Sequence, residues 1–494
     1  MRQAPPDSTG EGHPATQPRS PETTGEQPPD AAEPRPGTEQ PADREQPADR
    51  EQPPGAERLA GTEQSAGRQP SVAEQAAGVK PSAGAEQAAG VQQSAGAEQA
   101  APGNRLRREL PAVLAGLVSA LVGYASSFTV VLAGLRAVGA TPAQAASGLL
   151  AVCVAIGVTA IGLGWRYRMP IAIAWSTPGA ALLAATGPVP GGFPAAVGAF
   201  LLSGALMVLA GLVPWLTRAI AAIPRPIAGA MLAGVILSLC LAPVRAMVDL
   251  PLLATPVVLT WAVLFRFARQ WAVPGALLAA VAAIAVHGPG GSLGGAELRP
   301  APILTAPTLN PSVVVSLAIP LFLVTMAAQN VPGMAVLATY GYTPPLRPLL
   351  VATGAASALA APFGGHAVNL AAITAALTAG PDTHPDPRRR WIATVALGGG
   401  QLALGLGASL AMALVLLSPP ILVVAVAGLA LLPALGSSLA SAVTEADGRE
   451  AAVVTFVVTA SGMTILGIGS AFWGLLAGGL TALLLHRRAE KPSP

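Results

Sequence analysis

Long apolar stretches alternate with short polar breaks from residue 106 to residue 488. A helix needs about 20 residues to cross the hydrocarbon core of a bilayer, and most of these stretches have close to that length. Two of them, 170–187 and 364–380, are interrupted by Gly or Pro residues, so we predict discontinuous membrane segments there. The pattern predicts twelve uninterrupted segments, at residues 110–134, 143–164, 194–216, 226–243, 251–267, 271–287, 312–338, 347–361, 391–417, 420–442, 450–466 and 469–486.

The composition agrees with this pattern and excludes a soluble globular protein of the same length. Of the 494 residues, 52% are hydrophobic and 11% are charged, whereas soluble domains carry about 25% charged residues. The two cysteines, Cys153 and Cys240, are too few for a disulfide scaffold. We therefore predict an all-α polytopic membrane protein with fourteen transmembrane segments and without a metal or other cofactor.

The first 105 residues differ in composition from the rest of the chain. They contain 16 acidic and 9 basic residues, no aromatic residue, and repeats such as Glu-Gln-Pro-Ala-Asp-Arg. Such a segment cannot bury enough apolar surface to offset the entropy of ordering it. We predict a disordered cytoplasmic tail over residues 1–105, a membrane domain over 106–488, and a short cytoplasmic end over 489–494.

The basic residues predict the orientation of the segments. If all fourteen segments cross and the tail is cytoplasmic, seventeen Lys and Arg residues lie in cytoplasmic breaks. Only Arg136, Arg245 and Arg299 then lie on the opposite side. Because short cytoplasmic loops are enriched in Lys and Arg, both termini are expected in the cytoplasm. The expected location is the inner membrane of a bacterial-type cell.

The two discontinuous segments occupy matching places in the halves of the membrane domain, about 106–290 and 310–488. Each is the third segment of its half, and each combines breaker residues with a short apolar helix. A shift of 193 residues aligns Ser176 with Asn369 and Gly187 with Gly380. Because the offset is seven segments, an odd number, the halves would insert in opposite orientations as a 7+7 inverted repeat.

Broken helices at matching positions of inverted repeats are typical of secondary transporters. The N-termini of the two half-helices would then lie near the bilayer midplane. Their unpaired backbone N–H groups and positive dipole ends favour an anion such as a carboxylate. The sequence therefore predicts an anion-binding site between segments 3 and 10.

Three stretches carry a family resemblance, namely Met169–Leu183, Thr325–Leu337 and Phe363–Ile373. Together with the following Gly380–Arg388, they resemble the benzoate–proton symporter family (BenE type). This family is similar in fold to uracil transporters and sulfate permeases. The resemblance implies a core of segments 1–4 and 8–11 and a gate of segments 5–7 and 12–14. It also implies import of benzoate or a related aromatic carboxylate with protons, by an elevator or rocking motion of core against gate.

Five polar residues are candidates for substrate binding. Ser176 and Thr177 precede and begin the first half-helix, and Asn369 aligns with Ser176. Gln329 and Asn330 are adjacent amides within an otherwise apolar segment, where unbonded amides are costly. Helix capping and interhelical hydrogen bonding stay open as structural alternatives for these residues.

Further candidates line the same two breaks. Trp175 and Phe363 are predicted to stack on an aromatic ring, with ordinary packing as the alternative. His366 is the titratable residue at a discontinuous segment, so we predict that it couples proton movement, with a structural hydrogen bond as the alternative. Four residues are expected to shape the backbone of the site: Pro178, Gly179, Gly364 and Gly365.

Other function classes receive less support from the sequence. The chain has no GxxxxGK[ST] loop for an ATP-driven pump. The acidic residues after position 105 all lie at the ends of predicted segments or in loops, so the paired acids of an intramembrane enzyme are missing and we predict that the protein is not an enzyme. An anion channel, or a transporter of another small organic anion or nucleobase-like substrate, stays open. The expected partners are the carboxylate, protons and the lipid bilayer, without nucleic acid; a homodimer is a possible assembly.

Overall fold

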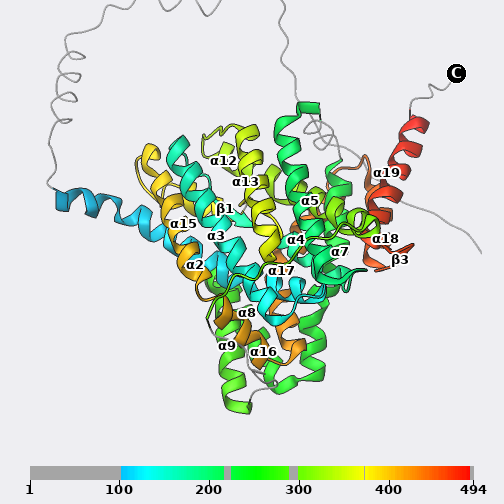
Figure 1. Ribbon diagram of the computed structural model, residues 1–494, viewed down its shortest axis with the longest axis horizontal. Helices are drawn as coiled ribbons and strands as arrows, with labels where there is room; N and C mark the ends of the chain where they lie inside the picture. The colour runs from blue at the N-terminus through cyan, green and yellow to red at the C-terminus, as the bar shows by residue number, and fades with distance from the viewer. Residues whose placement is uncertain (1–101, 216–223, 289–298, 372, 490–494) are drawn as a thin grey trace, which may run out of the picture. The chain divides into compact units, whose positions relative to one another are not determined.

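The structure is a computed structural model that describes residues 102–215, 224–288, 299–371 and 373–489 (Figure 1). The predicted tail up to residue 101 and the end from residue 490 lie outside the described residues. The first helix begins at Pro102, so residues 102–105, which the sequence assigned to the tail, belong to it.

The described residues of the first half of the membrane domain form helices and one short strand. Thr141 caps its second helix by accepting a hydrogen bond from the Gln144 backbone N–H, and the Gln144 side chain accepts from the Thr141 N–H. This reciprocal pairing satisfies two of the donors that every helix start leaves unpaired. The elements in chain order are α2 (Pro102–Ala137), α3 (Pro142–Tyr167), β1 (Ile173–Trp175), α4 (Thr177–Thr186), α5 (Gly192–Leu212), α7 (Arg225–Asp249), α8 (Pro251–Phe267), the 3-10 turn η1 (Arg269–Trp271) and α9 (Ala272–His287).

The second half repeats this order with more interruptions. Its third segment again combines a strand with a short helix, as the sequence predicted. The elements are α10 (Pro311–Val313), η2 (Val314–Ala318), α11 (Ile319–Thr325), η3 (Met326–Asn330), α12 (Val331–Thr339), α13 (Leu346–Ala360), η4 (Ala361–Phe363), β2 (Val368–Leu370), α14 (Ile373–Ala379), η5 (Pro387–Arg389), α15 (Trp391–Gly405), α16 (Ala408–Leu417), α17 (Pro420–Val443), α18 (Arg449–Ala460), β3 (Thr464–Ile465), β4 (Ile468–Gly469) and α19 (Ser470–Ala489).

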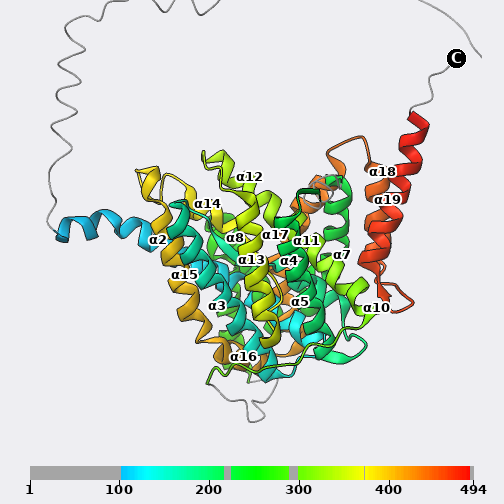
Figure 2. The same ribbon diagram turned by 45° about the horizontal axis from the view of Figure 1, so that its top comes forward.

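The helices pack in two groups that match the expected core and gate. In the core, α3 packs on α15, α5 packs on α13, and α2 packs on both α4 and α15. In the gate, α7 packs on α17 and α18, while α18 and α19 lie side by side (Figure 2). The core contacts also follow the repeat. In the second half, α13 is the counterpart of α3, and α15 is the counterpart of α5. The contact between α3 and α15 therefore corresponds to the contact between α13 and α5, as an inverted repeat requires.

Glycine pairs set both of these core crossings. A Cβ on Gly157 of α3 would lie 2.9 Å from the Gly398 carbonyl oxygen of α15, and a Cβ on Gly398 would lie 2.8 Å from the Gly157 oxygen. The same distances, 2.9 and 2.8 Å, relate Gly204 of α5 and Gly354 of α13. Small residues let helix backbones approach closely in membranes, where packing replaces the hydrophobic drive for association. The two repeats thus build their core crossings in the same way.

The number of membrane crossings stays a prediction. Among the described residues, eight helices are long and apolar enough to span a membrane, or up to nine if one bent pair counts as a span. That pair corrects the uninterrupted segment predicted at 391–417, because α15 and α16 meet at an angle of 56°. The bend lies between Gly405 and Gly407, where two residues of low helix propensity follow each other closely. The segment predicted at 450–466 is also shorter, since α18 ends at Ala460 and a two-stranded hairpin follows.

The segment predicted at 312–338 contains two π-helical turns, η2 and η3, that the hydrophobic pattern did not predict. Pro320 lies four residues after Ser316, in the middle of η2, and Pro332 lies four residues after Ala328, in the middle of η3. Proline has no N–H for an α-helical bond, and its ring clashes with the carbonyl four residues earlier. A wider turn removes that clash, and π turns of this kind frequently occur at functional sites.

A glycine substitution tests the core crossings. We expect Gly398→Ala to lower the apparent melting temperature of the detergent-purified protein, because overpacking a tight contact costs about 1–3 kcal/mol. Gly399→Ala is the matched control, since an added Cβ there meets no atom within 4 Å. The control should be neutral or slightly stabilising, because Ala favours helix over Gly. Equal melting temperatures for the two variants would contradict the close crossing.

Candidate functional site

The two discontinuous segments meet in a two-stranded antiparallel ladder. Ile173 pairs with Leu370, Ala174 with Asn369, and Trp175 with Val368. A two-fold relation through the central pair maps each residue of β1 onto the residue 195 positions later. The shift of 193 residues that the sequence suggested is therefore wrong by two, and Asn369 is the counterpart of Ala174 and not of Ser176.

Ser176 connects β1 to α4 and is fully buried. Its hydroxyl oxygen accepts a hydrogen bond from the Gly179 N–H at 3.1 Å and another from the Thr325 hydroxyl at 2.9 Å. Its backbone N–H donates to the Ala367 carbonyl at 2.9 Å. Ser176 is thus the N-cap of the first half-helix, and Thr325 of α11 holds the cap in place.

Two buried asparagines bind the end of β2. The Asn330 side-chain oxygen accepts from the Leu370 N–H at 3.0 Å. The hydrogen-bond network orients the Asn369 amide so that its oxygen accepts from the Ser176 N–H at 3.0 Å and its nitrogen donates to the Leu370 carbonyl at 2.8 Å. Both amides therefore satisfy backbone groups at the strand ends, where no helix supplies partners.

His366 lies just before β2 and is fully buried. Its Nε2 lies 3.1 Å from the carbonyl oxygen of Ser176. Because a carbonyl only accepts, Nε2 carries the hydrogen and the neutral ring keeps a free lone pair on Nδ1. That Nδ1 atom is buried and has no hydrogen-bond partner among the described residues. His366 thus joins the two breaks through one nitrogen and presents an unused acceptor through the other.

An aromatic cluster of residues from α2 and β1 packs beside the ladder. The Trp175 Nε1–H donates to the Ser127 hydroxyl at 3.0 Å. The Tyr124 ring stacks on Phe128 at a centroid distance of 5.4 Å and meets Trp175 edge to face at 5.8 Å. No pattern in the sequence marks these α2 residues, because Tyr, Ser and Phe at such positions are common in any membrane helix.

The remaining predicted substrate-binding residues are less buried than Ser176, Asn330 and Asn369. Thr177 and Gln329 are half-buried, and neither side chain makes a hydrogen bond with another described residue. Phe363 is also half-buried, in the turn η4, where its carbonyl accepts from the Ser147 hydroxyl of α3 at 2.9 Å. The ring contacts found among the described residues do not join Phe363 to Trp175. The structure therefore brings together the candidates of β1, α4, η3 and β2, with Phe363 on the α3 side.

The four predicted backbone-shaping residues lie in tight positions. Pro178 is in the first turn of α4, where proline needs no hydrogen-bond partner. A Cβ on Gly179 would lie 2.6 Å from Leu321 Cδ1, and one on Gly365 would lie 2.7 Å from Ala360 Cβ. Gly364 has φ +88°, a left-handed conformation that favours glycine.

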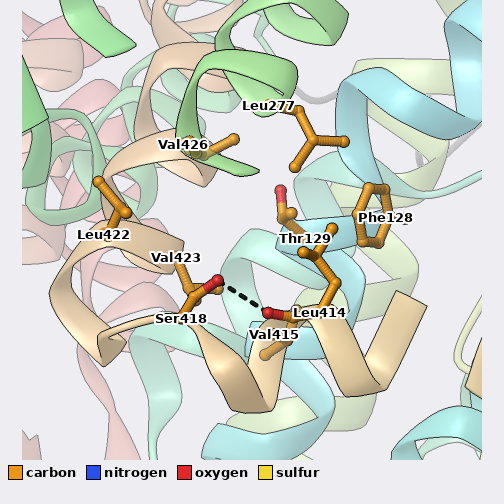
Figure 3. A pocket seen from close by; sticks show the side chains of 10 residues that line it. Phe128, Thr129, Leu277, Leu414, Val415, Ser418, Leu422, Val423 and Val426 are labelled. Atoms are coloured by element: carbon orange, nitrogen blue, oxygen red, sulfur yellow. Dashed lines mark hydrogen bonds between the residues drawn. The ribbon is translucent and has the colours of Figure 1, made fainter. Parts of the chain in front are cut away.

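A small cavity lies between the core and the gate, close to the aromatic cluster (Figure 3). Its volume of about 20 Å³ admits one water molecule but no aromatic acid. The Thr129 hydroxyl is buried there without a hydrogen-bond partner among the described residues. The lining residues come from α2, α9, the end of α16 and α17, and they are Phe128, Thr129, Leu277, Ala280, Leu414, Val415, Ser418, Leu422, Val423 and Val426.

Comparisons with known proteins agree with this architecture. A family model described as "BenE: Benzoate membrane transport protein" matches residues 107–484. Inner membrane protein YdcO of Escherichia coli (strain K12) is 38% identical over 381 residues, which cover 77% of this chain and 97% of that protein. The benzoate membrane transport protein of Acinetobacter baylyi is 33% identical over 389 residues, which cover 76% of this chain and 95% of that protein.

One solved structure extends the comparison to the fold. The transmembrane domain of a cyanobacterium bicarbonate transporter, BicA, aligns with a TM-score of 0.50 and 16% identity over 74% of this chain and 97% of that chain. At this identity the likeness concerns the fold alone.

The neighbouring amides of η3 offer a test of the site's construction. We expect Asn330→Ala to lower the apparent melting temperature, because it leaves the buried Leu370 N–H unpaired at a cost of about 1–3 kcal/mol. Gln329→Ala is the matched control, one residue away in the same π turn, and should keep the melting temperature of the parent protein. If both variants melt alike, Asn330 does not hold the strand.

Proposed function

Because the chain belongs to the benzoate membrane transport protein family, we propose that it imports benzoate or a related aromatic carboxylate together with protons. We place it in a bacterial inner membrane with both termini in the cytoplasm. The observation that carries the proposal is the buried junction of β1, α4 and β2. It combines a helix N-terminus, an aromatic cluster and a histidine with one nitrogen that has no hydrogen-bond partner among the described residues.

Thr177 supplies the anion contact at this junction. In the first turn of α4, Pro178 has no N–H, the Gly179 N–H is bonded to the Ser176 hydroxyl, and the Ala180 N–H is bonded to the Ser176 carbonyl at 2.8 Å. The Thr177 N–H and hydroxyl have no partner among the described residues, and the residue is half-buried. A carboxylate at this position would meet two donors and the positive end of the helix dipole.

The aromatic ring of the substrate would pack against the neighbouring apolar surface. Trp175 directly precedes the capping residue, and its ring is held by Ser127 and Tyr124. Stacked and edge-to-face aromatic pairs favour each other beyond the area that they bury. In this arrangement Ser176, Asn330 and Asn369 position the half-helix, while Gln329 is left to contact the substrate.

His366 is the proposed proton carrier. A proton would add at Nδ1, because Nε2 already carries a hydrogen that is bonded to the Ser176 carbonyl. A buried charged imidazole is costly without a nearby anion, and the substrate carboxylate would supply that anion. Proton and carboxylate therefore favour each other's binding, which is the reciprocal coupling that symport requires.

The proton also removes the electrical cost of uptake. A carboxylate that enters a negative-inside cell alone meets about 2.3 kcal/mol of opposition per 100 mV. Movement with one proton is electrically neutral. We propose that an elevator or rocking motion of the core against the gate carries both inward, since the two helix groups pack mainly within themselves.

Uptake into proteoliposomes tests the function and the role of Thr177. With an alkaline interior, we expect the parent protein to accumulate radiolabelled benzoate above its external concentration. Thr177→Val should raise the apparent KM about 10-fold or more, because a hydrogen bond to a charged group is worth about 1.5–3 kcal/mol. Thr186→Val on the same helix is the control and should keep the KM. Flux without accumulation would indicate a channel, and an unchanged KM in Thr177→Val would place the carboxylate elsewhere.

The proton carrier has a separate test. We expect His366→Gln to lose accumulation driven by the pH gradient but to keep benzoate counterflow, which needs binding and movement without net proton transfer. The Gln amide can still donate to the Ser176 carbonyl. His287→Gln, an exposed histidine at the end of α9, is the control. A His366→Gln variant that accumulates benzoate with the parent pH profile would eliminate this role.

A further inference from the structure

The described part of the connection between the two repeats crosses the core where α3 and α5 begin. Residues 299–310, which we call the strap, form neither a helix nor a strand and lead directly into α10. Most of these residues are exposed. Their backbone is nevertheless bonded to α16 at Arg299, to α3 at Ile303, to η4 at Thr305 and to α5 at Thr308. The proposed transport cycle gives the strap no role.

The strap supplies hydrogen-bond partners at the end of η4, where the last carbonyl groups of a helix have none of their own. The Pro362 carbonyl accepts from the Thr305 N–H at 2.7 Å. The Phe363 carbonyl accepts from the hydroxyl of Ser147 on α3 at 2.9 Å, and the same hydroxyl oxygen accepts from the Ile303 N–H at 2.8 Å. The Ile303 carbonyl is farther from this hydroxyl, at 3.4 Å. Ser147, which is 1% exposed, thus joins α3, η4 and the strap.

The first break has no such fastening among the described residues. The relation of 195 residues maps Pro362 and Phe363 onto Tyr167 and Arg168, which end α3. The carbonyls of Tyr167 and Arg168 have no hydrogen-bond partner in the described part of the chain, and Arg168 is exposed. A helix end before a break therefore does not require a strap. The strap is a departure from the symmetry of the repeats, and it acts on the break that contains His366.

The backbone around His366 is held on both sides by buried serine hydroxyls. Phe363, three residues before His366, is bonded to Ser147 as described. Two residues after His366, the Val368 N–H donates to the hydroxyl of Ser357 on α13 at 2.8 Å. Ser357 holds a residue that β2 already pairs with β1. Ser147 holds a residue that lies outside the ladder, so the approach to His366 depends on this one hydroxyl.

We propose that Ser147, together with the strap, is a positioning residue for His366. By fixing the Phe363 carbonyl, it holds the backbone so that Nε2 of His366 keeps its bond to the Ser176 carbonyl and Nδ1 stays at the junction. The consequence for transport rests on the proposed function, in which His366 carries the proton and the junction binds the carboxylate. Because proton and carboxylate favour each other's binding, a displaced His366 weakens the binding of both.

Benzoate counterflow at equal pH on both sides of proteoliposomes tests this role. Ser147→Ala leaves the Phe363 carbonyl and the Ile303 N–H unpaired and releases the backbone before His366. We expect the apparent KM for benzoate to rise several-fold, while the maximal rate per inserted protein stays close to that of the parent. Ser147→Thr keeps the hydroxyl and should recover most of the lost affinity. An unchanged KM in Ser147→Ala would overturn the inference.

Two other serines separate positioning from general stability. Ser409→Ala removes the bond from α16 to the Arg299 carbonyl at the start of the strap. It should lower the apparent melting temperature, as Ser147→Ala does, but keep the parent KM. Ser203 of α5 is fully buried, and its hydroxyl has no hydrogen-bond partner among the described residues. Ser203→Ala should therefore keep both values. If Ser409→Ala raises the KM as much as Ser147→Ala, the positioning role fails.

Chemical labelling of His366 gives a readout that needs no substrate. Diethyl pyrocarbonate acylates neutral imidazole rings that it can reach, and mass spectrometry of the full-length protein in detergent locates the product. We expect slow labelling of the buried His366 in the parent protein and in Ser409→Ala, and faster labelling in Ser147→Ala, because local opening exposes the ring. His287, which is exposed, serves as the internal reference.

The two readouts distinguish this inference from the proposed function. If the parent protein shows no benzoate counterflow but His366 is labelled faster in Ser147→Ala alone, the positioning role stands and the proposed function fails. If counterflow is present but His366 is labelled at the same rate in the parent protein and in both variants, Ser147 does not position His366.

Discussion

Backbone N–H and C=O groups inside a bilayer must be paired within the protein, and this constraint organises the whole core. Two segments leave the helical conformation at matching places, and the ladder of β1 and β2 pairs much of the backbone that they expose. The bonds continue past the ladder: the Ser176 N–H reaches the Ala367 carbonyl, and the Ala371 N–H reaches the Ala172 carbonyl. Ser357 of α13 accepts from the Val368 N–H at 2.8 Å. Extended backbone is stable there because each half supplies partners for the other.

This constraint also decides which polar side chains are free to bind a ligand. The sequence predicts Ser176, Asn330 and Asn369 as substrate ligands, because polar residues at membrane depth are costly unless they are hydrogen-bonded or bind a ligand, and that role stays a prediction. In the structure they satisfy the backbone of the breaks. Among the described residues, the groups without a hydrogen-bond partner at this junction include Thr177 in the first turn of α4 and Nδ1 of His366.

Hydrophobic length and the positions of Gly and Pro predicted most of the helical segments and both breaks, because these features act locally along the chain. The number of membrane crossings stays a prediction. The exact residue-to-residue relation between the repeats depends on the register of β1 and β2. The two segments share so few identical residues that their sequences alone do not distinguish a shift of 193 residues from one of 195. The two π turns follow from Pro320 and Pro332. A hydrophobic pattern does not predict them, because it does not include the effect of a proline on the preceding turn. Partners distant in sequence, such as Ser127 for Trp175 and Glu109 for His384, depend on packing that no single-chain pattern contains.

The proposed motion of the core against the gate would take place at the boundary between them. Around the cavity, α2 of the core meets α9 and α17 of the gate through mainly aliphatic side chains. The Ser418 hydroxyl there donates to the Leu414 carbonyl of its own segment, at 2.8 Å (Figure 3). Among the described residues, no side-chain hydrogen bond joins α2 to α9 or to α17. Sliding along such a surface exchanges one apolar contact for another and breaks no directional bond. The core itself is fastened by glycine crossings and by the ladder, so it would move as one body and carry the junction with it.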